Sequence, residues 1–249
     1  MKGKNKLNFK NNIDVKNYWE GVGEHRLSKN GFENYKRKKL YTMGWEISID
    51  EFIKRGNLDN CNRILDVGCG WGRTIIGIKN RFPHMEVIGV DLIPSLLRLA
   101  KDTLKKEANA ENVYFLQGDA QKLSFSESSF DAVLSSRVLQ YVIDPYKAIL
   151  EFKRVVKNKG RVVVFLPNKL NPIHYFTYHT KVYTPFKVAT WFRKANLRNI
   201  KVGSIRFTPY QSNIFKNPKV LYCLEHIVRF LPFVRFMGGL VSVSGQKNE

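Results

Sequence analysis

The chain has 249 residues, of which 43% are hydrophobic and 25% are charged, so a disordered chain is excluded and one large α/β domain fits where two would not. Its three cysteines, Cys61, Cys69 and Cys223, are too few and too scattered for a disulfide framework or a zinc site. The formal net charge of +21 favours attraction to nucleic acid or anionic lipid, although the same charge spread over a solvated surface needs no function.

The N-terminal residues 1–12 are rich in Lys and Asn and lack the apolar core of a secretory signal. Elsewhere no stretch reaches the ~18 apolar residues of a membrane span. We therefore expect a cytoplasmic protein, and peripheral contact with an anionic membrane surface stays open. The sequence does not indicate an oligomeric state.

Residues 1–57 are expected to form an N-terminal helical cap, with a short segment at Tyr18 and a longer helix from Tyr35 to Arg55. Residues 58–249 are expected to form the main domain. Lid-like insertions are predicted within it, at 168–184 and 208–238.

From residue 62 onward, short β-rich apolar runs alternate with helical segments. Strands are predicted at Arg63–Val67, Glu86–Asp91, Val113–Gln117, Phe130–Ser135 and Arg161–Leu166, and helices at Thr74–Arg81, Pro94–Glu107 and Pro145–Val156. This alternation is typical of βαβ units, which build a parallel sheet with helices on both faces.

Beyond Pro167 the pattern loosens into an aromatic, His-containing loop. Thr184 and Pro185 supply an N-cap and a first-turn proline for a helix that runs to about Ala195. The last elements are predicted as strands at Ile200–Phe207 and Leu240–Gly245, separated by an apolar helix at Lys219–Leu231.

The segment 63–72, Arg-Ile-Leu-Asp-Val-Gly-Cys-Gly-Trp-Gly, joins an apolar strand to a helix through Gly68, Gly70 and Gly72. Such glycines let a ligand approach the backbone at the carboxyl end of the strand, where open α/β sheets bind ligands. The spacing Gly-x-Gly-x-Gly differs from the Gly-x-Gly-x-x-Gly of dinucleotide dehydrogenases, so a pyrophosphate is less favoured.

Carboxylates end the next two predicted strands. Asp91 is placed to accept both hydroxyls of a ribose, and Asp119 follows the third strand, where it can accept an amino group such as that of adenine. For Asp66 and Asp131, a local structural role is an alternative to ligand binding, because carboxylates at strand ends often bind nearby backbone amides. For Asp131 that alternative is the better interpretation.

These motifs together resemble class I S-adenosylmethionine-dependent methyltransferases, specifically their small-substrate branch, over about residues 60–166. The resemblance implies a Rossmann-like, mostly parallel seven-stranded sheet with one antiparallel C-terminal strand, and S-adenosyl-L-methionine as the cofactor. It implies cofactor-binding roles for a set of residues at the strand tips: Asp66, Gly68, Gly70, Gly72, Asp91, Leu92, Asp119, Ala120 and Ser136. No metal is implied.

The sequence does not identify the methyl acceptor. A small molecule or a lipid or isoprenoid-type substrate is expected first, with tRNA or another RNA, or a noncatalytic cofactor-binding scaffold, as alternatives. If a hydroxyl is methylated, the candidates for the base are His174, His179 and Tyr141. Arg137, in the turn that the resemblance places beside the acceptor, is a candidate for binding an anionic substrate.

Overall fold

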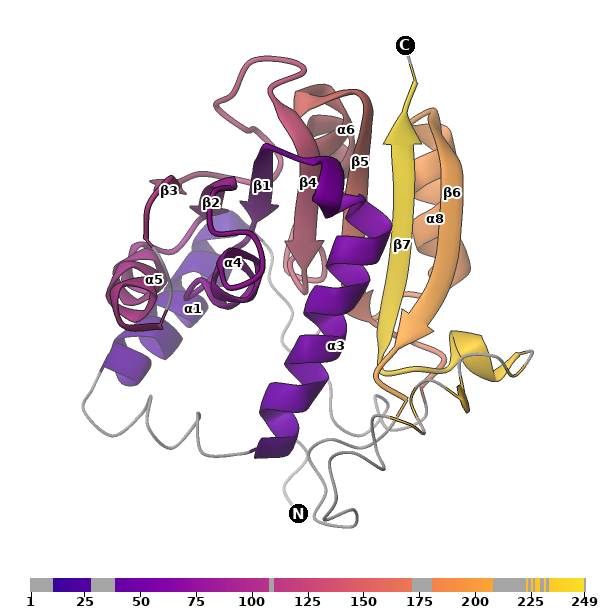
Figure 1. The fold of residues 1–249 in the computed structure, drawn as a ribbon, viewed down its shortest axis with the longest axis horizontal. Coiled ribbons are helices and arrows are strands. Elements are labelled where there is room, and N and C mark those ends of the chain that lie inside the picture. The colour runs from indigo at the N-terminus through magenta and orange to yellow at the C-terminus, as the bar shows by residue number, and fades with distance from the viewer. Residues whose placement is uncertain are drawn as a thin grey trace.

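The computed structural model describes residues 11–27, 39–107, 110–171, 181–207 and 233–248, together with residues 223, 225, 227, 228 and 231. Within this part of the chain, one sheet carries helices on both faces (Figure 1). Its strands are β1 (Arg63–Val67), β2 (Glu86–Asp91), β3 (Val113–Gln117), β4 (Phe130–Ser136), β5 (Val156–Pro167), β6 (Leu197–Ile205) and β7 (Leu240–Lys247). The helices are α1 (Asn12–Leu27), α3 (Lys39–Gly56), α4 (Arg73–Lys79), α5 (Pro94–Glu107), α6 (Pro145–Val155) and α8 (Pro185–Lys194), with 3₁₀ turns η1 (Leu58–Asn60) and η2 (Val234–Phe236).

The seven strands lie in the order β3-β2-β1-β4-β5-β7-β6. Strand β7 runs antiparallel to both of its neighbours, and the remaining pairs are parallel. The predicted mostly parallel sheet with one antiparallel C-terminal strand is therefore confirmed. Because the chain builds outward from β1 to β3 and then returns to place β4 on the other side of β1, the carboxyl ends of β1 and β4 flank a crevice suited to ligands.

Neighbouring residues of each central strand face opposite sides of the sheet, as the pleat requires. Ile64 of β1 packs with the buried side chains of α3, α4 and α5, whereas Leu65 packs with those of α6 and α8. Both faces are apolar, which explains why the central strands read as continuous runs of Val, Ile and Leu.

Element boundaries differ from the predicted ones by a few residues. Helix α1 already begins at Asn12, and the last-but-one strand begins at Leu197 instead of Ile200. The predicted cap at Thr184 is confirmed, since its side chain accepts a hydrogen bond from the Lys187 amide at 3.2 Å. Most of the helix expected at 219–231 and most of both insertions fall outside the described residues, and the division into domains stays a prediction.

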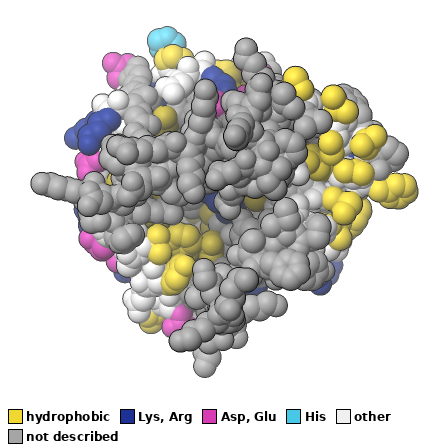
Figure 2. Space-filling model, turned by 90° about the horizontal axis from the view of Figure 1, so that it is seen from below, with side chains coloured by type: hydrophobic (Ala, Val, Ile, Leu, Met, Phe, Trp, Pro, Cys, Tyr) yellow, Lys and Arg dark blue, Asp and Glu magenta, His cyan; other side chains and the backbone are white. Residues whose placement is uncertain are grey.

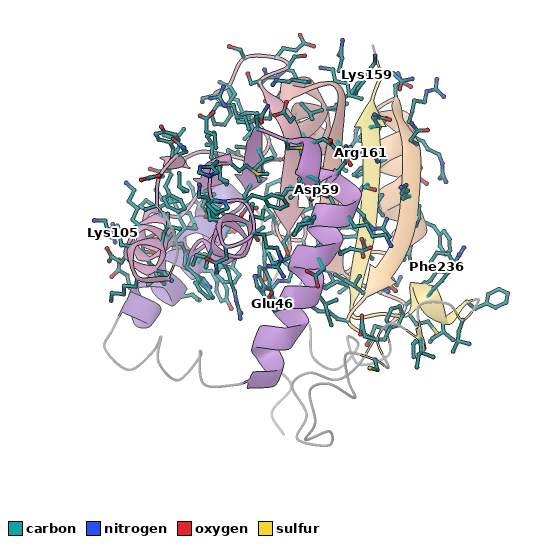
Figure 3. The ribbon with its side chains drawn as sticks, in the orientation of Figure 1. Glu46, Asp59, Lys105, Lys159, Arg161 and Phe236 are labelled. Carbon is teal, nitrogen blue, oxygen red and sulfur yellow. The ribbon has the colours of Figure 1, made fainter. Side chains whose placement is uncertain are left out.

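The N-terminal helices pack directly onto the sheet and its flanking helices. In α3, the ring of Phe52 stacks on Phe165 of β5 with centroids 3.9 Å apart. Glu46 of α3 accepts a hydrogen bond from Arg81 at 2.7 Å, and Figure 3 shows it on the side of α3 that faces α4. Helix α1 packs against α5, where Arg98 donates to Glu24 at 2.6 Å. These contacts hold both helices beside the crevice.

Several exposed apolar side chains belong to α8 and to the segment around η2, and α8 lies at the right in Figure 1. They include Phe186, Phe233 and Met237, with exposed fractions of 54%, 83% and 44%. Figure 2, seen from below, shows hydrophobic side chains grouped along this side of the molecule. In the described part of the chain, no helix combines the length and the hydrophobicity needed to cross a bilayer.

Candidate functional site

The site lies where the carboxyl ends of β1 and β2 meet. After β1 the chain turns through Gly68, Gly70 and Gly72, whose φ angles are 72°, 54° and 83°. The amide of Gly68 donates to the carbonyl of Val90 in β2 at 2.6 Å, and the Cys69 amide donates to the same carbonyl at 3.0 Å. The glycine loop is thereby fixed against the end of β2.

Each glycine in this loop has left-handed φ, a region that other residues occupy only at a cost of roughly 1–2 kcal/mol. A Cβ at Gly68 would overlap the Val138 side chain, so that position also requires close packing. A Cβ at Gly70 would meet nothing within 4 Å. The backbone at Gly70 therefore borders open space, as it must if a ligand lies on it.

Asp91 ends β2 directly beside this loop. Its carboxylate accepts the Gly70 amide at 2.7 Å and the Ile93 amide at 3.0 Å. Asp91 is buried at this position, with only 8% of its surface exposed. Burial raises the pKa of Asp91 to about 6, although the amides of Gly70, Ile93 and Leu92 lower it again by stabilising the anion.

Asp66 lies deeper, under the glycine loop, and is 1% exposed. Burial and then the nearby charge of Asp91 raise the pKa of Asp66 to about 8, while a hydrogen bond with Thr74 lowers it. Its Oδ2 atom has no hydrogen-bond partner within the described residues. The charge of Asp91 therefore adds to burial in favouring the protonated form of Asp66.

Asp131, in contrast, has a local structural role. It accepts the backbone amides of Asn62 and Arg63 at 2.9 and 2.8 Å, and the Lys157 ammonium at 2.7 Å. These contacts lie near the amino ends of β1 and β4, away from the crevice. The local interpretation of Asp131 is therefore confirmed.

The tip of β3 closes the other side of the site. Asp119 accepts the Gln121 amide at 2.9 Å, and the Gly118 amide donates to the Asp91 carbonyl at 3.0 Å. Ala120 is 8% exposed and packs in the core behind them. The ends of β2 and β3 are thus tied together through their backbones.

These strand tips enclose a cavity of about 230 Å³. Nine of the residues predicted for cofactor, base or acceptor binding line it: Gly68, Gly70, Asp91, Leu92, Asp119, Ala120, Ser136, Arg137 and Tyr141. Asp66 and Gly72 are not among the lining residues. Asp66 is buried in β1, and Gly72 ends the loop directly before α4, where its amide donates to the Cys69 carbonyl at 3.0 Å. His174 and His179 lie outside the described residues.

The sequence analysis missed the residues that α1 and α3 bring to this cavity. Val15 and Trp19 of α1 and Trp45 of α3 all line it. The Trp19 ring contacts the Tyr141 ring edge to face, with centroids 5.1 Å apart. No local pattern identifies these positions, because they reach the site only through the packing of two helices that precede the sheet in the sequence.

Comparison with known proteins agrees with this geometry. A model of a methyltransferase domain matches residues 65–164. A demethylmenaquinone methyltransferase of Thermus thermophilus is 32% identical over 163 residues, covering 64% of this chain and 70% of that protein. The chain belongs to the class I S-adenosylmethionine-dependent methyltransferases. Within that family, a malonyl-acyl-carrier-protein O-methyltransferase of Paenibacillus is 31% identical over 53% of this chain and 50% of its own length.

Solved structures with lower sequence identity share the fold of this chain. A phosphoethanolamine N-methyltransferase of Haemonchus contortus, solved in complex with S-adenosyl-L-methionine, superposes with a TM-score of 0.60 at 17% identity. The match covers 91% of this chain and 60% of that chain. For several curated relatives, the aligned part of this chain spans about half of the relative's length.

Proposed function

We propose that this protein transfers a methyl group from S-adenosyl-L-methionine to a small-molecule or lipid-type acceptor. One observation carries the proposal: the left-handed glycine loop, open at Gly70, meets the buried carboxylate of Asp91 at the mouth of the cavity. Such an arrangement offers backbone to the amino-acid part of the cofactor and a carboxylate to its ribose.

The residues present fit this cofactor. Asp91 and Asp119 line the cavity, and their carboxylates suit a ligand with positive charge, which the sulfonium and ammonium groups of S-adenosylmethionine supply. Leu92 and Ala120 would border the adenine, and Asp119 would accept its amino group. Gly68 and Gly70 would contact the methionine part.

Methyl transfer requires the chain to align a nucleophile and keep water away. When bound, S-adenosylmethionine supplies a methyl carbon whose bond to sulfur breaks as the bond to the nucleophile forms, with the electron pair staying on sulfur. A hydroxyl acceptor also loses a proton, which Tyr141, in the cavity wall against Trp19, would accept in its phenolate form. With an acceptor bound, the aromatic wall would shield that side of the site from water.

Apolar lining supports a hydrophobic acceptor. Val15, Ile93, Leu96 and Val142 line the cavity alongside the aromatic rings. The quinone methyltransferase and the acyl-carrier-protein methyltransferase among the relatives are consistent with such an acceptor. Arg235 is exposed beside the apolar patch near η2, and this combination supports contact with an anionic lipid surface when the acceptor is collected.

The net charge of +21 supports RNA as a second candidate acceptor. Labelled S-adenosylmethionine incubated with separated lipid, RNA, protein and small-molecule pools tests both. Label in the small-molecule or lipid pool is expected. Label in RNA, with steep salt dependence, would replace the leading proposal, and no label in any pool despite tight cofactor binding would favour a scaffold.

Cofactor binding is tested by calorimetry with S-adenosylhomocysteine. Asp91→Asn should weaken binding by at least about tenfold, a loss of ~1.4 kcal/mol, because a neutral amide replaces the acceptor for the ribose hydroxyls. Asp131→Asn is the matched control, since it changes the same chemical group at the opposite edge of the sheet. Equal affinity in the two variants would refute the assigned role of Asp91.

A further inference from the structure

Two side chains at and just after the end of β4 carry polar atoms that lack hydrogen-bond partners. Gln140 lines the cavity and is only 2% exposed, and its Oε1 atom has no partner within the described part of the chain. The hydroxyl oxygen of Ser136, another lining residue, is also unpartnered there. Ser135, which is buried outside the lining, donates to the Val67 carbonyl at 3.0 Å. Of these three polar side chains, only the two that line the cavity lack a partner.

An unpartnered oxygen at the depth of Gln140 destabilises the folded protein, because folding removes it from water without replacing the lost hydrogen bond. Other buried polar groups of the cavity wall are paired. The indole Nε1 of Trp45 donates to the Arg73 carbonyl at 3.3 Å, and the Asp91 carboxylate accepts two backbone amides. Gln140 therefore departs from the rule that the rest of the wall follows, and such departures are expected where a ligand binds.

Gln140 lies on the β4 side of the glycine loop. In the sheet, β4 and β2 flank β1 from opposite sides. A Cβ at Gly68 would overlap Val138, so the segment that carries Gln140 packs directly against the loop. The carboxylates assigned to the ribose and the adenine, those of Asp91 and Asp119, belong to the tips of β2 and β3. Gln140 is therefore left for the methyl acceptor.

The chemistry of the amide restricts the group that can bind it. Its Oε1 atom only accepts hydrogen bonds, so the ligand must present a donor. Gln140 is neutral and offers no opposite charge to a buried ion, and an aliphatic amine would be charged at neutral pH. Tyr141, which follows it, packs edge to face with Trp19 in the same cavity wall. A hydroxyl on an otherwise apolar ligand matches both features.

We infer that the methyl acceptor is an uncharged, largely apolar compound with a hydroxyl group, and that this hydroxyl donates a hydrogen bond to Oε1 of Gln140. Gln140 is thereby a specificity-determining residue, because a compound of the same shape without the hydroxyl would leave the amide unpaired and bind more weakly. Ser136 can bind either ligand, since its hydroxyl both donates and accepts. The inference rests on the proposed methyltransferase function.

The first test compares the stability of two variants without ligands. Gln140→Met keeps an unbranched side chain of similar length and removes the unpartnered amide, so it should raise the melting temperature by at least about 2 °C. Gln246→Met is the matched control. The Gln246 amide donates to the Lys159 carbonyl at 2.8 Å and accepts a hydrogen bond from Asn199 at 2.7 Å, so its loss should lower the melting temperature. An equal fall in both variants would show that Gln140 serves the fold, and would overturn the inference.

The second test separates the acceptor from the cofactor. In calorimetry, Gln140→Met should bind S-adenosylhomocysteine within about threefold of wild type, whereas Asp91→Asn should lose at least about tenfold. A loss in Gln140→Met as large as that in Asp91→Asn would assign Gln140 to the cofactor instead.

The third test measures turnover with labelled S-adenosylmethionine and the extract pool that accepts the label. Gln140→Met should raise the apparent KM for this pool at least about fivefold, with the KM for S-adenosylmethionine unchanged. Gln140→Asn keeps an amide and should recover part of the loss. Gln246→Met should match wild type. An unaltered acceptor KM in Gln140→Met would refute the contact.

The fourth test identifies the donor on the acceptor. Acetic anhydride converts the hydroxyls of the extract into esters and its amines into amides, and mild alkali then cleaves the esters but leaves the amides. Labelling by wild type should disappear after acetylation and return after alkali. Extract exposed to alkali without acetylation is the reference. Labelling that survives acetylation, or that alkali does not restore, would rule out the hydroxyl.

The outcomes distinguish this inference from the proposed function. Methylation of acetylated extract would overturn the hydroxyl contact and leave the methyltransferase function intact. No methylation of any untreated pool by a protein that binds S-adenosylhomocysteine would overturn both.

Discussion

Replacing Asp66 by Asn removes a carboxylate that the fold buries under the glycine loop. Burial and the charge of Asp91 raise the pKa of Asp66 from 3.8 to about 8. The folded protein therefore holds a proton that the unfolded chain releases between these two pH values. By linkage, this group makes the folded state progressively less stable as the pH rises from about 4 to about 8.

The size of the effect follows from the shift. Each pKa unit that separates the folded and unfolded states is worth ~1.4 kcal/mol. Asn stays neutral in both states, so Asp66→Asn should gain stability over wild type by about 3 kcal/mol between roughly pH 5.5 and pH 8.5. Terms that do not depend on pH, such as altered hydrogen bonding of the amide, cancel in this difference.

Urea unfolding at the two pH values measures the free energy of unfolding of each protein. Asp131→Asn is the control, because hydrogen bonds from Lys157 and two backbone amides lower the pKa of Asp131, which is therefore ionised throughout this range. Its stability difference from wild type should stay constant. If the difference for Asp66→Asn were also constant, Asp66 would be ionised in the folded protein and our account of the buried acidic pair would fail.

Three further predictions concern the walls of the site. Gly68→Ala should lower the free energy of unfolding, measured in urea, by at least ~3 kcal/mol, because its methyl group would overlap the Val138 side chain. Gly70→Ala should lower it by only about 1–2 kcal/mol, because Gly70 faces open space, but should weaken the binding of S-adenosylhomocysteine measured by calorimetry. Equal losses of stability in the two variants would contradict this account. Phe165→Ala should cost about 3–5 kcal/mol because it leaves a void under α3, and a loss below ~1 kcal/mol would show that α3 is not anchored there. Trp19→Ala should leave the melting temperature nearly unchanged but raise the apparent KM for the acceptor, and an unaltered KM would place the acceptor away from Tyr141.

Most of the sheet and its crossovers follow from local patterns. Strand β1 and helix α5 begin and end at the predicted residues. An apolar run of strand length and an amphipathic run of helix length can both be recognised from residues that are adjacent in the sequence. Where the prediction missed, as at Asn12 and Leu197, the ends of the elements are set by packing against α5 and β7. Propensity does not encode such contacts.

The cofactor side of the site is predictable for a related reason. The glycine loop and Asp91 lie on adjacent parallel strands, and parallel strands place their carboxyl ends at one edge, so their proximity follows from order along the chain. The sequence pattern does not predict how deeply these carboxylates are buried. Burial raises the pKa values of Asp91 and Asp66 above those of exposed carboxylates.

By itself, the sequence determined the parallel sheet and the position of the glycine loop, because each depends on residues close together in the chain or on the regular succession of strand and helix. The reversed last strand followed only from the resemblance to the methyltransferase family. Only the tertiary structure decided which side chains form the aromatic side of the cavity. Trp19, Trp45 and Arg137 come from segments separated by tens of residues, and they meet because α1 and α3 pack back over the edge of the sheet. Their chemistry is a property of that packing, since nothing in the spacing of these residues specifies which side chains will share one cavity.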